Sequence, residues 1–355
     1  MKAINKFIVS LVLFSTQSDA IIIRHDKPSE DYQVQQDAQP CVVNLDFLMG
    51  TLIAPQWIIT AAHGTPLMPA GHKVTIGGEV YEVDKIIPHP DYQPQGKSPE
   101  LAQNNDLALL KLNKPVLNVT SVPLYLKDDE TDKTVNLVGQ GYIGNGQQGI
   151  TGAANGLYRA QNKIDQADDH WLYFDFDAPE QGAMPLEGVS GPGDSGGPAF
   201  IQANYGPQLA GISSHQIDNA QGQPMVYGVT EKYTRVSRYI DWIGNVMKMS
   251  EAELTKVQAY RPSHTVVVAS QADKKELLGH YQVAHFPTLI IEHCELTLCY
   301  RWEGQPRLTQ ILKSADDKWF TPRLNRWFEI KRNNDGKIDE LYFHGYQGGR
   351  SAKKI

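Results

Sequence analysis

The sequence has few cysteines, no cluster of basic residues and no long apolar run, and each shortage excludes something. Its only cysteines are Cys41, Cys294 and Cys299. An oxidising compartment would therefore allow one disulfide and leave one thiol, and the fold must depend on its core. Cys294 and Cys299, with His293 beside them, lack the second half of a zinc site, and we expect no metal. No Lys/Arg block and no uninterrupted apolar run of about 18 residues occurs, which argues against nucleic acid as a partner and against a transmembrane helix.

The first twenty residues have the pattern of an export signal. Lys2 and Lys6 give a positive start, residues 7–14 (FIVSLVLF) form a short apolar core, and Ser18-Asp19-Ala20 resembles a small-x-small cleavage site. The alternative is a buried strand at the start of the fold. We expect a signal peptide over residues 1–20, a mature chain that begins at Ile21, and a location in the periplasm or outside the cell.

The remainder reads as a β-rich globular protein of two or three domains. The chain has 355 residues, of which 41% are hydrophobic and 21% charged, and a net charge of −7. From residue 21 to 233, short apolar runs such as LALLKL (107–112) alternate with turn residues, which predicts an all-β sandwich or barrel. Apolar residues recur at helical spacing over 237–249, and a domain boundary is expected at 250–272.

Three segments carry residue types that together suit nucleophilic catalysis. His63 directly follows an apolar strand in WIITAAHG (57–64), Asp106 begins another in NNDLALLKL (104–112), and Ser195 lies in GDSGGP (193–198). A serine hydroxyl is a poor nucleophile near neutral pH, so it needs an adjacent base, and histidine has a suitable pKa. The imidazole in turn needs a carboxylate that fixes its tautomer.

The segments TAAH, HPDY (89–92), NNDLALLKL and GDSGGP occur in an order that resembles the trypsin/chymotrypsin-like serine peptidases, over about residues 21–249. The resemblance implies two β-barrels and a C-terminal helix over residues 21–250. It implies a serine endopeptidase in which His63 is the general base, Asp106 orients it and Ser195 is the nucleophile. Such an enzyme acts on proteins or peptides and requires no cofactor.

The same resemblance assigns roles around the nucleophile. The N–H groups of Gly193 and Ser195 would form the oxyanion hole. Asp194 would pair with a newly exposed apolar N-terminus, here Ile21, so that signal peptidase itself would activate the enzyme; the alternative is an ordinary first strand. Ser214 matches the family's serine behind the catalytic aspartate, and residues 214–216 would pair with an extended substrate.

The specificity pocket departs from the family pattern. Val189, followed by Ser190, stands six residues before the nucleophile, where trypsin-like members have Asp. His215 and Gln216 replace the usual Trp-Gly, and Gln216 would narrow the pocket mouth. The third pocket position is Glu231 or Gly228, depending on where the gap is placed, so cleavage after Arg or Lys and cleavage after small or apolar residues both stay open.

Residues 272–355 do not fit the peptidase pattern. The Gly-x-Tyr at 279–281, the aromatic-rich runs and the turn in RNNDGKI (332–338) resemble the small antiparallel β domain, lipocalin-like in form, appended to bacterial penicillin-binding-protein-like serine hydrolases. Substrate capture, partner docking and stability are all open as its role. Six aromatic residues would either line a ligand groove or form its core: Tyr300, Trp302, Trp319, Phe320, Trp327 and Phe328.

Two other function classes fit the same sequence. A non-catalytic binding protein on a peptidase scaffold would be expected to lack a member of the triad, and none is missing. An esterase could use the same triad on non-peptide esters, because the triad does not distinguish ester from amide.

Overall fold

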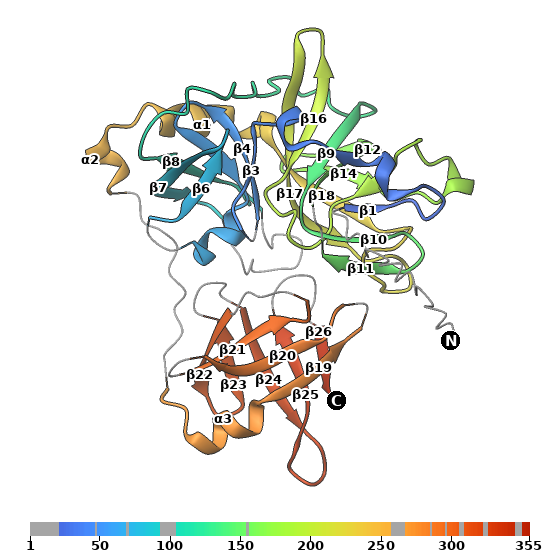
Figure 1. Ribbon diagram of the computed structural model, residues 1–355, viewed down its shortest axis with the longest axis vertical. Coiled ribbons are helices and arrows are strands. Elements are labelled where there is room, and N and C mark those ends of the chain that lie inside the picture. The colour runs from blue at the N-terminus through green and yellow to red at the C-terminus, as the bar shows by residue number, and fades with distance from the viewer. Residues whose placement is uncertain are drawn as a thin grey trace, which may run out of the picture.

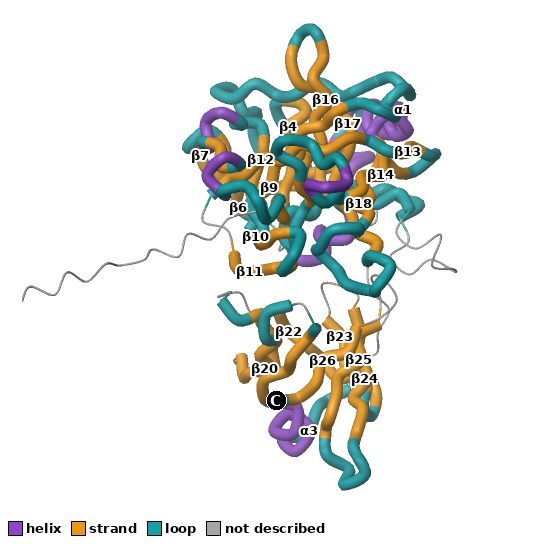
Figure 2. The backbone as a smooth tube through the Cα atoms, turned by 90° about the vertical axis from the view of Figure 1, so that its right-hand side faces the viewer, coloured by secondary structure: helices purple, strands orange, loops and turns teal. Residues whose placement is uncertain are grey.

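The computed structural model describes residues 21–46, 48–68, 71–92, 104–153, 156–256, 267–284, 286–294, 297–304, 309–321, 326–344 and 350–355. The predicted signal peptide at residues 1–20 lies outside the described residues. Figure 1 shows an N-terminal part with two strand-rich lobes and a separate C-terminal barrel below them, and Figure 2 shows the same separation after a 90° turn.

The first lobe is a six-stranded antiparallel sheet whose edge strands contact each other. Short apolar runs form this sheet. Its edge strand Lys73–Ile76 alternates exposed and buried residues, as a half-buried strand should. In sheet order the strands are β3 (Val42–Asn44), β4 (Met49–Ala54), β5 (Trp57–Thr60), β8 (Ala108–Leu112), β7 (Glu79–Pro88) and β6 (Lys73–Ile76).

The second lobe combines an eight-stranded and a four-stranded sheet. The larger sheet runs β13 (Gln166–Ala167), β14 (Trp171–Asp175), β18 (Thr230–Arg235), β17 (Gly206–Ile217), β16 (Pro198–Ala203), β9 (Thr134–Gly139), β12 (Leu157–Lys163) and β2 (Gln33–Val34). The smaller one runs β11 (Gly149–Ala153), β10 (Tyr142–Asn145), β1 (Ile21–Ile23) and β15 (Gly188–Val189), and β1 pairs with β10 in parallel.

Helices are few and short. The predicted helix appears as the 3-10 turn η5 (Val236–Tyr239) followed by α1 (Ile240–Met247), which buries Ile243 and Val246. The remaining helical segments are η1 (Ser29–Asp31), η2 (Gln36–Ala38), η3 (Ala62–Leu67), η4 (Pro179–Gln181), α2 (Glu251–Leu254) and α3 (Gln271–Leu277). Among the described helices, none is long and apolar enough to cross a membrane.

The C-terminal part is a closed antiparallel barrel, and α3 precedes it. Its strands are β19 (Gly279–Val283), β20 (Leu289–Cys294), β21 (Thr297–Trp302), β22 (Thr309–Ala315), β23 (Lys318–Thr321), β24 (Arg326–Arg332), β25 (Ile338–His344) and β26 (Arg350–Lys354). Cys294 and Cys299 form a disulfide between β20 and β21, and Cys41 is a buried free thiol.

The barrel interior is an apolar core. Tyr300, Trp319, Phe320 and Phe328 are all buried, and Trp302 packs against the core from its edge; the side chain of Trp327 lies outside the described residues. The core interpretation therefore holds for Tyr300, Trp319 and Phe328, whereas Phe320 is buried but does not belong to the barrel core.

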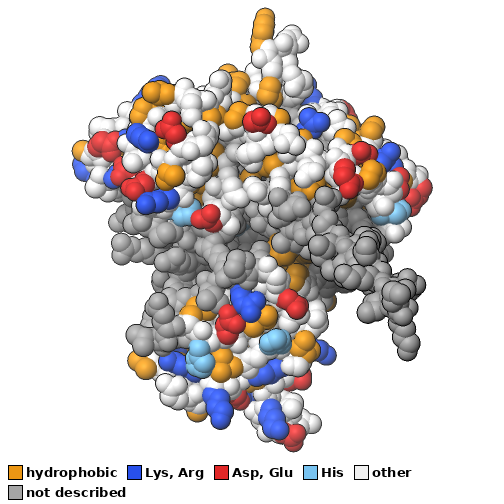
Figure 3. Space-filling view, viewed as in Figure 1, with side chains coloured by type: hydrophobic (Ala, Val, Ile, Leu, Met, Phe, Trp, Pro, Cys, Tyr) orange, Lys and Arg blue, Asp and Glu red, His pale blue; other side chains and the backbone are white. Residues whose placement is uncertain are grey.

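The fold class predicted from the sequence is confirmed: the protein is all-β, with two barrel-like lobes, a terminal helix and an additional antiparallel barrel. One described ion pair links the two parts, with Arg350 Nη2 3.4 Å from Asp218 Oδ1. On the face seen in Figure 3, acidic and basic side chains are interspersed over both parts.

Candidate active site

His63 and Asp106 are brought together by the pairing of two strands. Thr60, at the end of β5, pairs with Ala108 at the start of β8, so the residues just beyond these ends are neighbours. Asp106 Oδ2 accepts a hydrogen bond from His63 Nδ1 at 2.7 Å, and Oδ1 accepts one from the His63 backbone N–H at 2.8 Å. The two bonds fix the imidazole relative to the carboxylate and present Nε2 on the other side.

Asp106 is fully buried and ionised. Burial alone raises its pKa, but the charge of His63 and the hydrogen bonds from His63 and Ser214 outweigh burial and hold the pKa below its usual range. Ser214 Oγ donates to Asp106 Oδ2 at 2.5 Å, and Thr234 Oγ1 donates to the Asp106 backbone carbonyl at 2.9 Å. The carboxylate is thus held by donors from two segments of the chain, and a third segment holds the Asp106 backbone.

Ser195 lies on a tight loop between β15 and β16. Its backbone carbonyl accepts a hydrogen bond from Met49 N at 2.7 Å, and the next residue, Gly196, donates to Ser213 O at 2.8 Å. Gly196 has φ +79°, and a Cβ there would lie 2.2 Å from Thr60 Oγ1. Only glycine fits this contact, which presses the loop against the end of β5 that leads to His63.

The residues before Ser195 form a bend around a buried acid. Gly193 has φ +98°, a conformation that favours glycine. The Asp194 carboxylate accepts hydrogen bonds from Gly141 N at 2.6 Å and from Gly191 N at 2.8 Å. Burial raises the pKa of Asp194 to about 6, although backbone donors, including Ile21 N–H, act in the opposite direction.

Ile21 is a buried residue of β1 that lies against this acid. Ile21–Ile23 pairs with β10 on one side and β15 on the other. Ile21 is thus part of a paired strand, as the alternative interpretation expected, and its backbone N–H acts to lower the pKa of Asp194. Its role in activation stays a prediction.

Gly141 has a part in this site that the sequence interpretation missed. Its N–H holds Asp194 in place, and the close-spaced glycines in VGQGY (138–142), which follow an apolar strand, are the signal for such a backbone contact.

Ser190, Gln216 and Glu231 form a buried polar cluster next to the loop. The strand register pairs Gln216 with Glu231, and Gly228 lies outside the pairing. Burial raises the pKa of Glu231 to about 8, while hydrogen bonds from Ser190 and Gln216 lower it. Val189 is not part of this cluster: it is fully buried and packs against Ile22 and other apolar side chains.

His215 completes the segment expected to contact substrate. Its ring meets Trp171 edge-on, with ring centroids 4.9 Å apart. Burial, and secondarily the positive charge of Lys232, lower the pKa of His215 to about 3. His215 is therefore neutral near pH 7, and its Nδ1 lies 3.2 Å from Ser214 Oγ.

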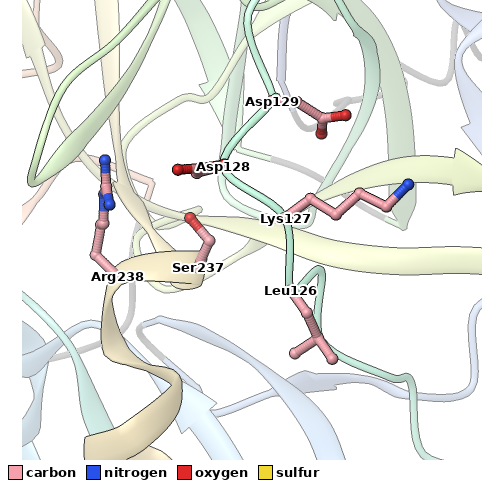
Figure 4. A pocket seen from close by; sticks show the side chains of 6 residues that line it. All are labelled: Leu126, Lys127, Asp128, Asp129, Ser237 and Arg238. Atoms are coloured by element: carbon pink, nitrogen blue, oxygen red, sulfur yellow. The ribbon is translucent and has the colours of Figure 1, made fainter.

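A surface hollow of about 490 Å³ lies elsewhere, where the segment before β9 meets η5 (Figure 4). Its lining carries charges of both signs and includes no predicted site residue. The residues are Leu126, Lys127, Asp128, Asp129, Ser237 and Arg238.

The two barrel-like lobes, with a histidine–carboxylate pair beside a serine loop, define the class of the two-barrel serine peptidases. The profile of the trypsin family matches residues 29–243, and the chain belongs to this family.

The chain is also similar to CLIP domain-containing serine protease B4 of Anopheles gambiae. The two are 27% identical over 224 residues, an alignment that covers 55% of this chain and 60% of the relative. The chain thus spans only about 60% of the length of this curated relative.

Proposed function

We propose that the protein is an exported serine endopeptidase that cleaves peptide bonds through Ser195, His63 and Asp106. The observation that carries the proposal is the doubly bonded pair of His63 and Asp106, backed by Ser214, next to the Ser195 loop. A buried ionised carboxylate beneath a histidine is what a general base needs, because it fixes the tautomer and stabilises the imidazolium.

The proposed reaction has two halves. Ser195 Oγ attacks the carbonyl carbon of the scissile bond while its proton passes to Nε2 of His63, and the N–H groups of Gly193 and Ser195 bind the resulting oxyanion. The C–N bond then breaks as His63 returns the proton to the leaving amine, which leaves an acyl-enzyme. Water repeats the sequence and releases the acid.

Export and activation form a further part of the proposal. The disulfide between Cys294 and Cys299 suits an oxidising compartment, as does the predicted signal peptide. Cleavage after Ala20 would turn the Ile21 N–H into an ammonium group beside Asp194, where a buried positive charge has a carboxylate partner. N-terminal sequencing of active protein should begin at Ile21; a start well downstream would rule out activation by signal peptidase.

Peptide hydrolysis tests the proposal directly. The mature protein, incubated with a mixed peptide library, should yield new peptide termini by mass spectrometry, and Ser195→Ala should yield none. Cleavage of aryl esters without any peptide cleavage would favour the esterase. No turnover of either by folded protein would favour the binding protein, and the C-terminal barrel would then be the first place to seek a ligand.

A further inference from the structure

The segment that leads into β8 is held at three consecutive residues by donors from β14, β18 and the η5 turn that directly follows β18. Trp171 Nε1, in β14, donates to Asn104 Oδ1 at 3.1 Å. The Tyr239 hydroxyl, in η5, donates to Asn105 Oδ1 at 3.1 Å. The backbone carbonyl of Asp106 accepts the third bond, from β18. The position of this first-lobe segment therefore depends on the second lobe and on the turn that follows it.

Asn105 has a backbone conformation that costs free energy for most residues. Its φ is +63°, in the left-handed region that asparagine tolerates better than other residues with a side chain. Its amide group is bonded at both ends, because Oδ1 accepts from Tyr239 and Nδ2 donates to the backbone carbonyl of Asp91 at 3.1 Å. Its own carbonyl accepts from Leu107 N at 2.8 Å, so the chain turns sharply around Asp106. Such a conformation persists only where surrounding contacts impose it.

The HPDY segment (89–92) lies on the other side of Asn105. It supplies the Asp91 carbonyl that accepts from the asparagine amide. The ring of His89 lies edge-on against the ring of Tyr239, with centroids 5.3 Å apart. The motif therefore contacts both Asn105 and the tyrosine that bonds to it.

Tyr239 combines a buried ring with a hydroxyl that is available as a donor. The residue is 5% exposed, and burial raises its pKa, so the hydroxyl keeps its proton near neutral pH. His170 Nδ1 lies 3.2 Å from the same oxygen. The ring belongs to the same buried apolar cluster as Leu107, which follows Asp106. Removing the hydroxyl alone would thus leave the packing of the ring in place and take away its bond to Asn105.

We propose that Tyr239 is a positioning residue: by holding Asn105 in its left-handed conformation, it fixes Asp106 where the carboxylate bonds to His63. The inference rests on the proposed peptidase function and adds a residue outside the triad to it. Without the hydroxyl, Asn105 would relax toward the right-handed region and turn the next carboxylate away from His63 Nδ1, which lies 2.7 Å from it. The imidazolium that forms during the reaction would then be stabilised less, so turnover would slow while substrate binding stayed the same.

Two single variants and their combination test this on the full mature protein, with whichever substrate, peptide or ester, the wild-type protein cleaves. Tyr239→Phe should lower kcat by about fivefold or more, as expected for loss of one hydrogen bond, and change KM by less than about twofold. Asn105→Gly, whose backbone can still adopt a positive φ but which lacks Oδ1, should have a similar effect. The combined variant should lose little more than either single variant, because both changes remove the same bond.

A matched control and a count of active sites separate slower turnover from loss of folded protein. Tyr125→Phe also removes the hydroxyl of a buried tyrosine, here one that donates to Asp129, and should leave kcat unchanged. A fluorophosphonate probe counts active Ser195 in every sample, and kcat is expressed per active site.

The outcomes distinguish failure of the proposed function from failure of this inference. Folded wild-type protein that does not react with the probe would overturn both. Wild-type protein that reacts, together with Tyr239→Phe that keeps its kcat, would overturn the inference alone, as would losses that add in the combined variant. If Tyr239→Phe does not fold, Asn105→Gly should still show the loss of kcat, and an unchanged kcat would count against the inference.

Discussion

The two-barrel part and the C-terminal barrel differ in what they bury. Among its described residues, the first buries five acidic side chains: Asp106, Glu130, Glu187, Asp194 and Glu231. In the described residues of the C-terminal barrel, the buried polar or charged residues are Lys313 and Thr321, and the rest of the interior is apolar. Burying a charge costs free energy unless it is paired, so a part that buries many acids is built for more than stability.

The buried acids of the first part differ in their partners. Glu130 pairs with Arg235, and Asp106 with His63. Glu187 and Asp194 depend on backbone N–H donors, and Glu231 on the side chains of Ser190 and Gln216. The hydrogen bonds of Asp194 and Glu231, the acids near Ser195, therefore depend on the conformation of the surrounding loops.

The largest expected effect comes from Asp106→Asn. The amide would keep the shape of the carboxylate but not its negative charge. It would therefore neither fix the required His63 tautomer nor stabilise the imidazolium, and kcat/KM should fall by about 10⁴. Peptide hydrolysis rates measure this, and circular dichroism checks that the fold is retained. A decrease of less than tenfold would mean that His63 does not act as the base.

The next effect tests the contrast in buried charge. Arg235→Met leaves Glu130 buried without its bidentate partner, which contacts it at 2.6 and 3.1 Å, and should cost about 3–5 kcal/mol of stability in chemical denaturation. The matched control is Lys313→Met in the C-terminal barrel. Lys313 pairs with Asp273 and Asp316, both nearer the surface, and its loss should cost about 1 kcal/mol or less. Equal losses of stability in Arg235→Met and Lys313→Met would contradict the difference in buried charge between the two parts.

The third prediction concerns pH. Because the pKa of Glu231 is raised to about 8 from 4.5, the folded state holds a proton that the unfolded state releases between these values. Stability should therefore fall as pH rises through this window, by up to about 1.4 kcal/mol per pH unit.

Glu231→Gln should remove this slope, so the variant should gain stability relative to wild type between pH 5 and 8. Thermal unfolding of both proteins across that range measures the difference, in which Asp194 and Glu187, common to both, cancel. A difference that does not change with pH would show that Glu231 is ionised throughout.

The smallest effect belongs to the C-terminal barrel. Replacing both Cys294 and Cys299 with serine opens a disulfide that closes a short loop, which should cost about 2 kcal/mol. Active-site labelling should be unchanged, and Cys41→Ala, which leaves the disulfide intact, serves as control. Loss of labelling in the double serine variant would mean that the barrel supports the site.

The sequence predicted the elements that local pattern determines. The apolar runs at 57–60 and 107–112 are strands within a residue of where their pattern placed them, and His63 and Asp106 do meet. The motifs succeed because the strand ends that carry them are fixed by pairing in the core.

The sequence could not predict which side chains on neighbouring strands face each other. Whether Gly228 or Glu231 faces Gln216 depends on how residues are divided between the turn after β17 and the strand β18, and three residues separate the two choices. The aromatic residues of the C-terminal barrel posed the same difficulty: inward and outward faces differ by one residue, and only closure of the barrel shows that Trp319 and Phe328 face in.

The central claim is that Ser195 is an activated nucleophile, and fluorophosphonate labelling of the mature protein, measured by intact mass, tests it most directly. The account predicts a single adduct on wild-type protein, and none on Ser195→Ala. Folded wild-type protein that takes up no adduct, or an adduct that persists in Ser195→Ala, would contradict it.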